Sequence, residues 1–303
     1  LRHEHLFVSL LKTLVPDENT PVTELALWDQ KVTLENLHLV RERKPIADNR
    51  FLSDERVAVD EAIEFRDAGG RTIVDVTSIG IRRDPMALLR VSNATGLNIV
   101  MGGGWYQKVY HPADMDERTV EDLSQEIVRD ITKGVGSTGI RSGIIGEVGV
   151  SGEPIEPNEV KSIQASVRAS RATGAAITLH LGGVGREKLQ TIGIMADEGG
   201  DLSRVIFGHS DAIAGDMPLM QELLSHGVYL EFDLLGRTGV PLDFKPVRDD
   251  GLAGFLWAGT ALVADAVPKL IDAGYADRIL LSQDVCTKVA LKRYGGTGYS
   301  YIL

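Results

Sequence analysis

The sequence contains a single cysteine, Cys286, among its 303 residues. One cysteine cannot form a disulfide within the chain or supply a zinc ribbon, and such scarcity is typical of proteins from a reducing compartment. We therefore expect a cytoplasmic location. Long apolar runs are missing as well, and none approaches the roughly 20 residues that a transmembrane helix requires. We accordingly expect no membrane partner.

An excess of basic residues is also absent. The chain has 32 Lys and Arg against 43 Asp and Glu, which gives a formal net charge of -11. No stretch combines clustered cations with interleaved aromatic residues, as a nucleic-acid-binding surface would. We therefore expect a small-molecule substrate and no nucleic-acid partner. A chain of this length can bury a core without a structural metal, so a bound metal would serve chemistry.

Short β-branched apolar runs alternate with longer amphipathic segments from residue 57 onward, a pattern typical of βα units. Strands are expected near residues 71–77, 97–101, 142–148, 175–180, 204–209, 228–233 and 278–284, after a first strand that ends at His5. Helices are expected near 57–68, 84–95, 117–133, 156–173, 186–198, 216–226 and 259–273. Asp84 and Gly96 mark the two ends of the second helix as its N-cap and its first residue beyond the C-terminus.

Eight strands and seven helices predict an α/β fold, a (β/α)8 TIM-type barrel formed as a single domain by residues 1–303. The chain opens at the end of the first strand and stops before an eighth helix, so we expect a barrel trimmed at both termini. A doubly wound sheet is the alternative, but residues 5–8 lack the glycine-rich turn that it requires. Residues 6–56 form an unusually long first βα loop, and such loops are usually functional lids or mobile segments.

Polar side chains stand where six of these segments end. They are His3, His5, Glu147, His180, His209 and Asp284. In a (β/α)8 barrel the carboxyl ends of all strands surround one mouth, which is where such enzymes hold their active sites. A single histidine at a strand end is usually a satisfied core or rim residue. Six such residues placed coherently predict one functional centre instead.

The spacing of His3 and His5 points both imidazoles to the same side of a strand, so both can bind one ion. Two more histidines and two carboxylates exceed the needs of one tetrahedral site. The set suits two divalent ions that share a bridging carboxylate and a bridging hydroxide. We therefore expect two metal ions as cofactors, with zinc the first choice and manganese, cobalt or iron also compatible with these ligands.

The sequence resembles the phosphotriesterase family of the amidohydrolase superfamily. The resemblance is carried by His3-Glu4-His5-Leu6 and by residues 69–77 (GGRTIVDVT), 95–100 (TGLNIV), 143–149 (GIIGEVG), 208–211 (GHSD) and 281–284 (LSQD). It implies that His3, His5 and Asp284 hold a buried ion and that His180 and His209 hold a more exposed one. It also implies a homodimer.

The bridging ligand separates branches of that family. The predicted strand 142–148 holds no lysine that carbon dioxide could carboxylate, since the nearest, Lys133 and Lys161, lie outside it. The sequence instead resembles the phosphotriesterase-related branch, in which a glutamate bridges both ions, and this role would fall to Glu147. The pattern at residues 294–299 (YGGTGY) also resembles that branch.

The expected scissile bond follows from departures within the resemblance. Ala212 and Leu234 stand where organophosphate hydrolases carry a proton-shuttling acid and histidine, whereas Tyr106 matches a tyrosine of lactone-hydrolysing relatives. We therefore expect a metal-dependent hydrolase of lactones or other carboxylic esters, attacked by the metal-bridging hydroxide. Asp284 is the expected proton acceptor and donor. Tyr106 is either an oxyanion donor or a wall of the substrate pocket.

Other functions remain open on the sequence alone. The same centre could cleave an amide of the N-acyl amino acid type or a phosphotriester, and a non-catalytic metal-binding barrel is a third hypothesis. Six intact ligands argue against the last. Arg237, in the loop after the seventh strand, is the predicted contact for an anionic group of the substrate.

Overall fold

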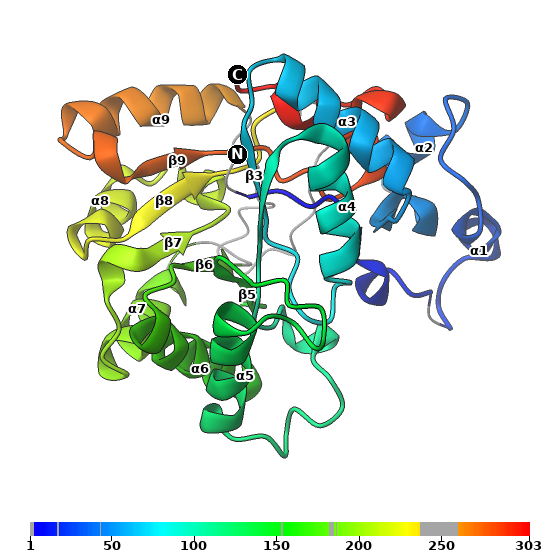
Figure 1. The fold of residues 1–303 in the computed structure, drawn as a ribbon. Coiled ribbons are helices and arrows are strands. Elements are labelled where there is room, and N and C mark those ends of the chain that lie inside the picture. Colours follow the sequence, from blue (N-terminus) through cyan, green and yellow to red (C-terminus); the bar gives the residue numbers. More distant parts are fainter. Residues whose placement is uncertain are drawn as a thin grey trace.

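The strands of the protein surround a central axis, and the long helices lie outside them (Figure 1). The structure is a computed structural model that describes residues 3–16, 18–42, 44–152, 154–181, 185, 187–236 and 260–303. The parallel strands are β3 (Thr72–Asp75), β4 (Asn98–Met101), β5 (Ile145–Val150), β6 (Ile177–Leu181), β7 (Val205–Phe207), β8 (Tyr229–Phe232) and β9 (Ile279–Leu281). Strand β3 pairs with β4, and β5 to β9 pair in chain order. Each lies within or beside a segment predicted as a strand.

Residues 3–5 close the ring between β3 and β9. The Glu4 amide donates to the Val74 carbonyl at 3.1 Å, and the Val76 amide donates back to Glu4 at 3.0 Å. On the other side the Asp284 amide donates to the carbonyl of His3 at 3.2 Å. The segment therefore takes the place of the predicted first strand, and its histidines reach the same mouth as Asp284.

The second closure lies between β4 and β5. The Gly143 amide donates to Met101 at 2.9 Å, and the Gly146 amide donates to Gly103 at 2.5 Å. These bonds pair the two segments through Gly103, after β4, and Gly143, before β5. Together with the contacts of residues 3–5, they complete the (β/α)8 barrel that the βα pattern predicts.

The seven expected helices are confirmed. They are α3 (Glu55–Asp67), α4 (Pro85–Thr95), α5 (Val120–Thr132), α6 (Pro157–Thr173), α7 (Glu187–Asp197), α8 (Met217–Ser225) and α9 (Thr260–Asp272). The Asp84 carboxylate accepts the Ala87 amide at 3.0 Å, and Gly96 ends α4 with a left-handed φ of 74°. Both caps are those that the sequence predicts. None of the described helices combines the length and the hydropathy needed to span a membrane.

The first loop contains regular structure that the sequence does not predict. Its elements are the antiparallel strands β1 (Val8–Ser9) and β2 (Phe51–Leu52) and the helices α1 (Val22–Trp28) and α2 (Leu37–Arg41). Helix α1 lies at the edge of the molecule, away from the barrel (Figure 1). No residue of α1 is buried, so the helix has no core-facing apolar stripe from which the sequence could predict it.

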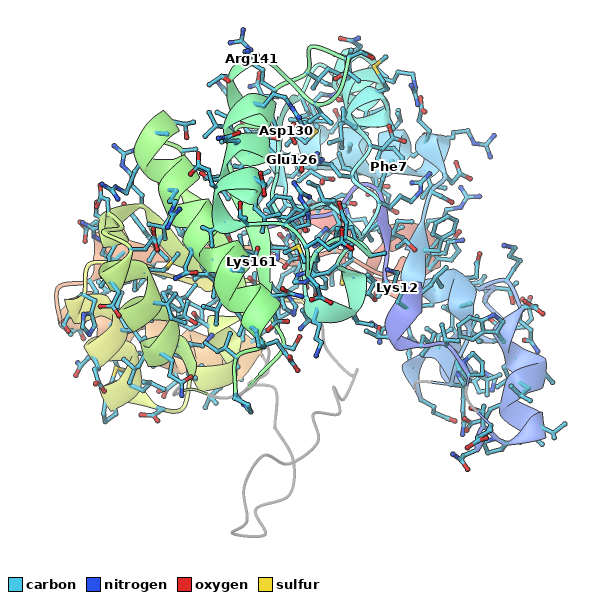
Figure 2. All side chains as sticks on the ribbon, turned by 90° about the horizontal axis from the view of Figure 1, so that it is seen from below. Phe7, Lys12, Glu126, Asp130, Arg141 and Lys161 are labelled. Atoms are coloured by element: carbon cyan, nitrogen blue, oxygen red, sulfur yellow. The ribbon has the colours of Figure 1, made fainter. Side chains whose placement is uncertain are left out.

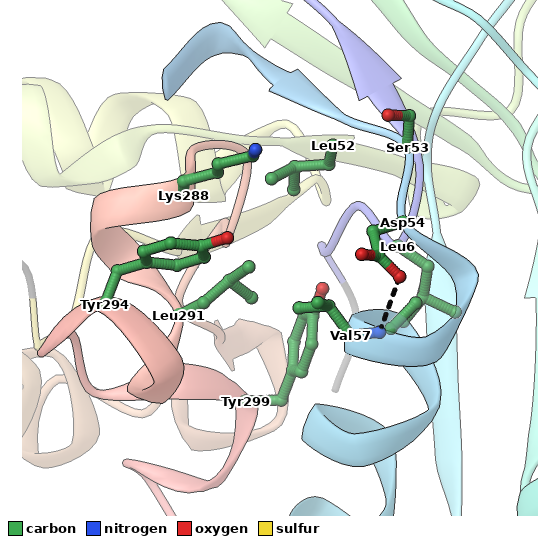
Figure 3. Close-up of a pocket in the computed structure, with 10 residues that line it drawn as sticks. Leu6, Leu52, Ser53, Asp54, Val57, Lys288, Leu291, Tyr294 and Tyr299 are labelled. Carbon is green, nitrogen blue, oxygen red and sulfur yellow. Dashed lines mark hydrogen bonds between the residues drawn. The ribbon is translucent and has the colours of Figure 1, made fainter. Parts of the chain in front are cut away.

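Short 3-10 turns complete the structure. They are η1 (Leu11–Thr13), η2 (Ala47–Arg50), η3 (Lys108–Tyr110), η4 (Leu202–Arg204), η5 (Ser210–Ile213), η6 (Ala276–Arg278), η7 (Lys288–Ala290), η8 (Lys292–Tyr294) and η9 (Gly298–Ser300). The last three follow β9, and the described residues 282–303 contain no α-helix. Figure 3 shows a small cavity where this C-terminal segment meets the end of the first loop, between Tyr299 and Leu52. The Tyr299 hydroxyl donates to the carbonyl of His5 at 2.8 Å, so the C-terminal segment stabilises the backbone of a residue at the barrel mouth.

Apolar side chains occupy both faces of the strands. On the outer face, residues such as Leu179, Phe207 and Phe232 pack against the surrounding helices, and a second cluster packs Ile73 and Met101 with residues of α3 and α4. On the inner face, a smaller cluster fills the amino-terminal end of the barrel interior, which we call the barrel floor. The floor is formed by Val74, Val100, Ile144, Ala176, Ile206, Tyr229 and Leu280. Polar residues of the interior therefore lie above the floor, toward the mouth.

A buried ion pair fixes α5 against the barrel. The Arg83 guanidinium, which precedes α4, donates to the Asp130 carboxylate of α5 at 2.8 Å, and both side chains are buried. Figure 2 shows Asp130 on this helix, beside Glu126. Arg83 also reaches the carbonyl of Gly102 at 3.4 Å, at the end of β4. The pair thus connects two βα units through a charge that has little access to water.

We expect Asp130→Ala to lower the free energy of unfolding by about 3 to 5 kcal/mol, because it leaves the Arg83 charge buried without its partner. Urea denaturation measures this change. The matched control is Asp265→Ala, which breaks the exposed pair between Asp265 and Lys269 on α9 and should cost less than about 1 kcal/mol. Equal losses in the two variants would contradict the role assigned to the buried pair.

Candidate metal centre

The six predicted ligands converge at the carboxyl ends of the strands. Glu147 stands at their centre, within a register shift of β5 between Ile145 and Val148. Its Oε2 lies 3.1 Å from His3 Nε2 and 3.0 Å from His180 Nδ1, while its Oε1 lies 3.3 Å from His5 Nε2. A bulge redirects a side chain out of the regular alternation of a strand. Here it brings one carboxylate among three histidines from two other segments, residues 3–5 and β6.

Asp284 joins this group from beyond β9. Its Oδ1 lies 3.4 Å from His5 Nε2. Asp284 and His209 have left-handed φ values of 47° and 52°, and among the described residues Arg82 is the third non-glycine residue with positive φ. Such conformations cost free energy and persist where the surrounding structure holds them. Both predicted ligands therefore leave their strands through a constrained turn that aims them into the mouth.

His180 and His209 form the other side of the group. Nε2 of His209 lies 2.7 Å from Nδ1 of His180 and 3.9 Å from Oε2 of Glu147. The two rings meet nearly at right angles, with centroids 4.5 Å apart. Their nitrogens thus share one small region with a carboxylate oxygen.

The donor atoms fall into sets that fit metal ions. His3, His5 and Glu147 bring ligand atoms within 4.8 Å of one another, and so do Glu147, His180 and His209. A third set of this kind joins His3, His209 and Asp233. Imidazole nitrogens and carboxylate oxygens are suitable ligands for zinc, manganese, cobalt and iron. Glu147 belongs to the first two sets. The residues present therefore fit two ions, and the carboxylate of Glu147 is available to each.

Outer partners orient the ring of two of these histidines. Nδ1 of His5 contacts the Thr77 hydroxyl at 2.8 Å, and this hydroxyl donates to the Phe7 carbonyl at 3.0 Å. Nδ1 of His209 faces Asp233 Oδ1 at 2.7 Å. In each case Nδ1 is engaged from outside, which leaves Nε2 directed at the centre.

Charge within the site is maintained against burial. Burial alone would raise the pKa of the Glu147 carboxyl, but the neighbouring His180 and His3 outweigh it and hold this pKa well below its usual value. Asp233 behaves in the same way, since His209 and His3 outweigh burial and lower its pKa. Both carboxylates are therefore ionised at neutral pH and present negative charge to a cation.

Tyr106 lies at the edge of the centre. Its hydroxyl is 3.0 Å from both ring nitrogens of His180, and the two rings are 4.6 Å apart. Nε2 of His111, a residue that the sequence did not indicate as part of the site, donates to the carbonyl of Tyr106 at 2.8 Å. This bond holds the loop that carries Tyr106. The structure thus places Tyr106 beside one predicted ligand, while Arg237 lies outside the described residues.

Several residues of the site were not singled out from the sequence. Asp233 and Glu231 stand two residues apart in and beyond β8, and both are fully buried. Acidic residues at alternate positions of an otherwise apolar strand are the signal that could have found them. Cys286 is also close, with Sγ 3.7 Å from Oδ2 of Asp284.

Known proteins match this chain over its full length. The profile of the phosphotriesterase family matches residues 1–303. A phosphotriesterase-related protein of Nematostella vectensis is 34% identical over 307 residues, which cover 100% of this chain and 85% of the relative. An N-acetyltaurine hydrolase of Dictyostelium discoideum is 37% identical over 288 residues, which cover 91% of this chain and 73% of the relative.

Solved structures agree with these sequence relatives. A resiniferatoxin-binding protein from Rhodobacter sphaeroides superposes with a TM-score of 0.90 at 33% identity, covering 100% of this chain and 81% of the other. A phosphotriesterase homology protein from Escherichia coli, solved with phosphate in its active site, gives 0.80 at 26% identity, covering 100% and 87%. The barrel, the convergent histidines and carboxylates and these matches lead to one conclusion: the chain belongs to the phosphotriesterase family and is a hydrolase of that family.

Proposed function

We propose that this protein hydrolyses the amide bond of an N-acyl amino acid or N-acyl aminosulfonate at a centre of two divalent metal ions. The observation that supports the centre is the position of Glu147. Its Oε1 faces His5, and its Oε2 faces His3 and His180. A carboxylate so placed can serve two cations at once. His3, His5 and Asp284 would hold one ion, His180 and His209 the other, and Glu147 would bridge them.

The amide assignment is supported by the relatives. Proteins named N-acetyltaurine hydrolase from Dictyostelium discoideum and Danio rerio are 37% and 34% identical to this chain. N-acetyltaurine is an acetamide whose nitrogen comes from an amine that carries an anionic sulfonate. The net charge of -11 gives no general attraction for an anion, so a local cation must recognise it. Arg237 is our candidate for that contact.

The chemistry divides between the ions and the side chains. When bound, two divalent ions lower the pKa of water and polarise a carbonyl. Asp284 is placed to accept the proton of the attacking water on a carboxylate oxygen and to pass it to the leaving amine. An amine leaves poorly without a proton, so this transfer matters more for an amide than for an ester. The Tyr106 hydroxyl can donate to the oxyanion that forms at the carbonyl.

Lactones and other carboxylic esters, the first expectation from the sequence, are the second candidate substrates. The observation that favours them is the match of Tyr106 to a tyrosine of lactone-hydrolysing relatives, and its hydroxyl lies 3.0 Å from His180 at the mouth. Phosphotriesters are the least favoured, since Ala212 and the buried Leu234 supply no ionisable side chain for a proton shuttle. The homodimer implied by the family resemblance is likewise a proposal, which sedimentation would test.

A substrate panel tests this function. Protein loaded with zinc or manganese is given N-acetyltaurine, N-acetyl amino acids, simple lactones, an aryl ester and a phosphotriester at equal concentrations. We expect the highest kcat/KM for an N-acyl amide that carries an anionic group. A preference for lactones would replace the amide with the second candidate. A preference for phosphotriesters would overturn both.

We expect Glu147→Gln to reduce bound metal from about two ions per chain to one or fewer, and to abolish turnover in parallel. The amide supplies one neutral acceptor oxygen where two cations need negative charge. Metal content after gel filtration, measured by elemental analysis, provides the readout. The exposed Glu222→Gln makes the same chemical change far from the mouth and should retain both ions. Two tightly held ions in Glu147→Gln would show that the bridge is elsewhere.

We expect Tyr106→Phe to lower kcat roughly a hundredfold, about 3 kcal/mol, with little change in KM, because the lost donor acts on the oxyanion. Steady-state kinetics on the best substrate of the panel measure both constants. Tyr110→Phe is the control: its ring packs 5.4 Å from that of Tyr106, but its hydroxyl contacts Thr13 at 3.2 Å. Unchanged kcat in Tyr106→Phe would reduce this residue to a wall of the pocket.

A further inference from the structure

Mostly small side chains separate the apolar floor of the barrel interior from the candidate metal ligands at its mouth. Seven residues each follow a floor residue by two positions and so belong to the same side of their strands: Val76, Gly102, Gly146, Thr178, Gly208, Glu231 and Ser282. We call these seven residues the middle layer. Three of them are glycines at which a Cβ atom would come within 2.1 Å, 2.2 Å and 2.8 Å of backbone carbonyl oxygens. Glu231 is the longest side chain of this layer and its one ionisable group.

Gly208, the residue after β7, makes room for the side chains nearer the mouth. A Cβ atom on Gly208 would come within 3.2 Å of both Asp233 Oδ2 and His3 Cε1. The missing side chain thus lets His3 and the acidic residues of β8 approach one another inside the barrel. This part of the interior is shaped around an imidazole and carboxylates, whereas barrel interiors are generally filled by bulky branched residues.

Glu231 contacts one imidazole. Its Oε2 lies 3.4 Å from Nδ1 of His3, and its side chain has no exposure to solvent. Neither of its oxygens accepts a hydrogen bond from the described residues. Asp233 Oδ2 lies 3.2 Å from the same Nδ1, but Asp233 also accepts from the amide of His209 at 2.9 Å and from its ring at 2.7 Å. Asp233 therefore divides its contacts between His209 and His3, whereas His3 is the imidazole that Glu231 approaches.

A buried carboxylate without strong hydrogen bonds is costly, and an apolar side chain of equal length would fill the same space without that cost. We infer that Glu231 is a positioning residue that holds His3 for the inner metal ion. Its carboxylate faces Nδ1 from the floor side, next to that of Asp233, and this negative charge favours a proton on Nδ1 and leaves Nε2 to bind the ion beside Glu147. This inference rests on the metal centre of the proposed function and not on its substrate.

The test compares Glu231→Gln and Glu231→Met with the parent protein. Gln keeps the shape and removes the charge, and Met keeps the volume and removes the polarity. Metal-stripped proteins are titrated with zinc in competition with a chromophoric chelator, and the melting temperature of each metal-free protein is recorded. Thr178→Val is the matched control, since it removes a buried hydroxyl of the same middle layer that makes no hydrogen bond to the described residues.

We expect both Glu231 variants to bind one of the two ions about 10 to 100 times more weakly, while the other ion binds as in the parent. The metal-free melting temperature should stay the same or rise, and Thr178→Val should keep both parental affinities. If Glu231→Met does not fold, the zinc affinities of Glu231→Gln decide the test. Parental affinity for both ions in folded Glu231→Gln would overturn the inference, as would weaker binding that merely follows a lower metal-free melting temperature.

The outcome is separable from that of the substrate assignment. A parent protein that binds two ions but cleaves no N-acyl amide would overturn the proposed substrate and leave the role of Glu231 intact. A parent that binds no ion would overturn both. Normal amide hydrolysis with unaltered metal binding in Glu231→Gln would overturn only the role of Glu231.

Discussion

The close approach of Glu147 to histidines from separate segments is the constraint on which the site depends. Its carboxylate is within 3.0 to 3.3 Å of nitrogens of His3, His5 and His180, and all of these groups are withdrawn from water to a large degree. Burial opposes the ionised form, yet the imidazoles keep the Glu147 carboxyl ionised. Such a concentration of donors and negative charge is poorly satisfied by the side chains alone and well satisfied by cations.

The barrel is built to maintain this arrangement. Backbone hydrogen bonds to Val74 and Val76 hold residues 3–5 in the barrel wall. These bonds thereby position His3 and His5 at the mouth. Below the ligands, the interior changes from an apolar floor to a layer of mostly small side chains and Glu231. Outside the ring, Thr77 and Asp233 fix individual imidazoles. Rigid strands therefore position the ligands, and outer carboxylates and hydroxyls orient them.

The sequence predicts most of this architecture because its signals are local and repeated. Alternating apolar runs and marked helix ends, such as Asp84 and Gly96, locate the strands and helices, and the topology of a barrel then brings six polar strand ends together. Helix α1 was missed because it buries no residue, and α2 because it has only five residues, of which Leu37 and Val40 are buried. Glu231 and Asp233 were missed because their alternation in the sequence shows that they share one side of β8, but not that this side faces the barrel interior.

The central claim is that Glu147 serves two ions at once. Anomalous diffraction at the zinc absorption edge, from crystals of the zinc-loaded protein, tests it most directly. We expect two anomalous peaks about 3.5 to 4 Å apart, with one oxygen of Glu147 directed at each. A single peak, or two peaks of which Glu147 contacts only one, would contradict the account.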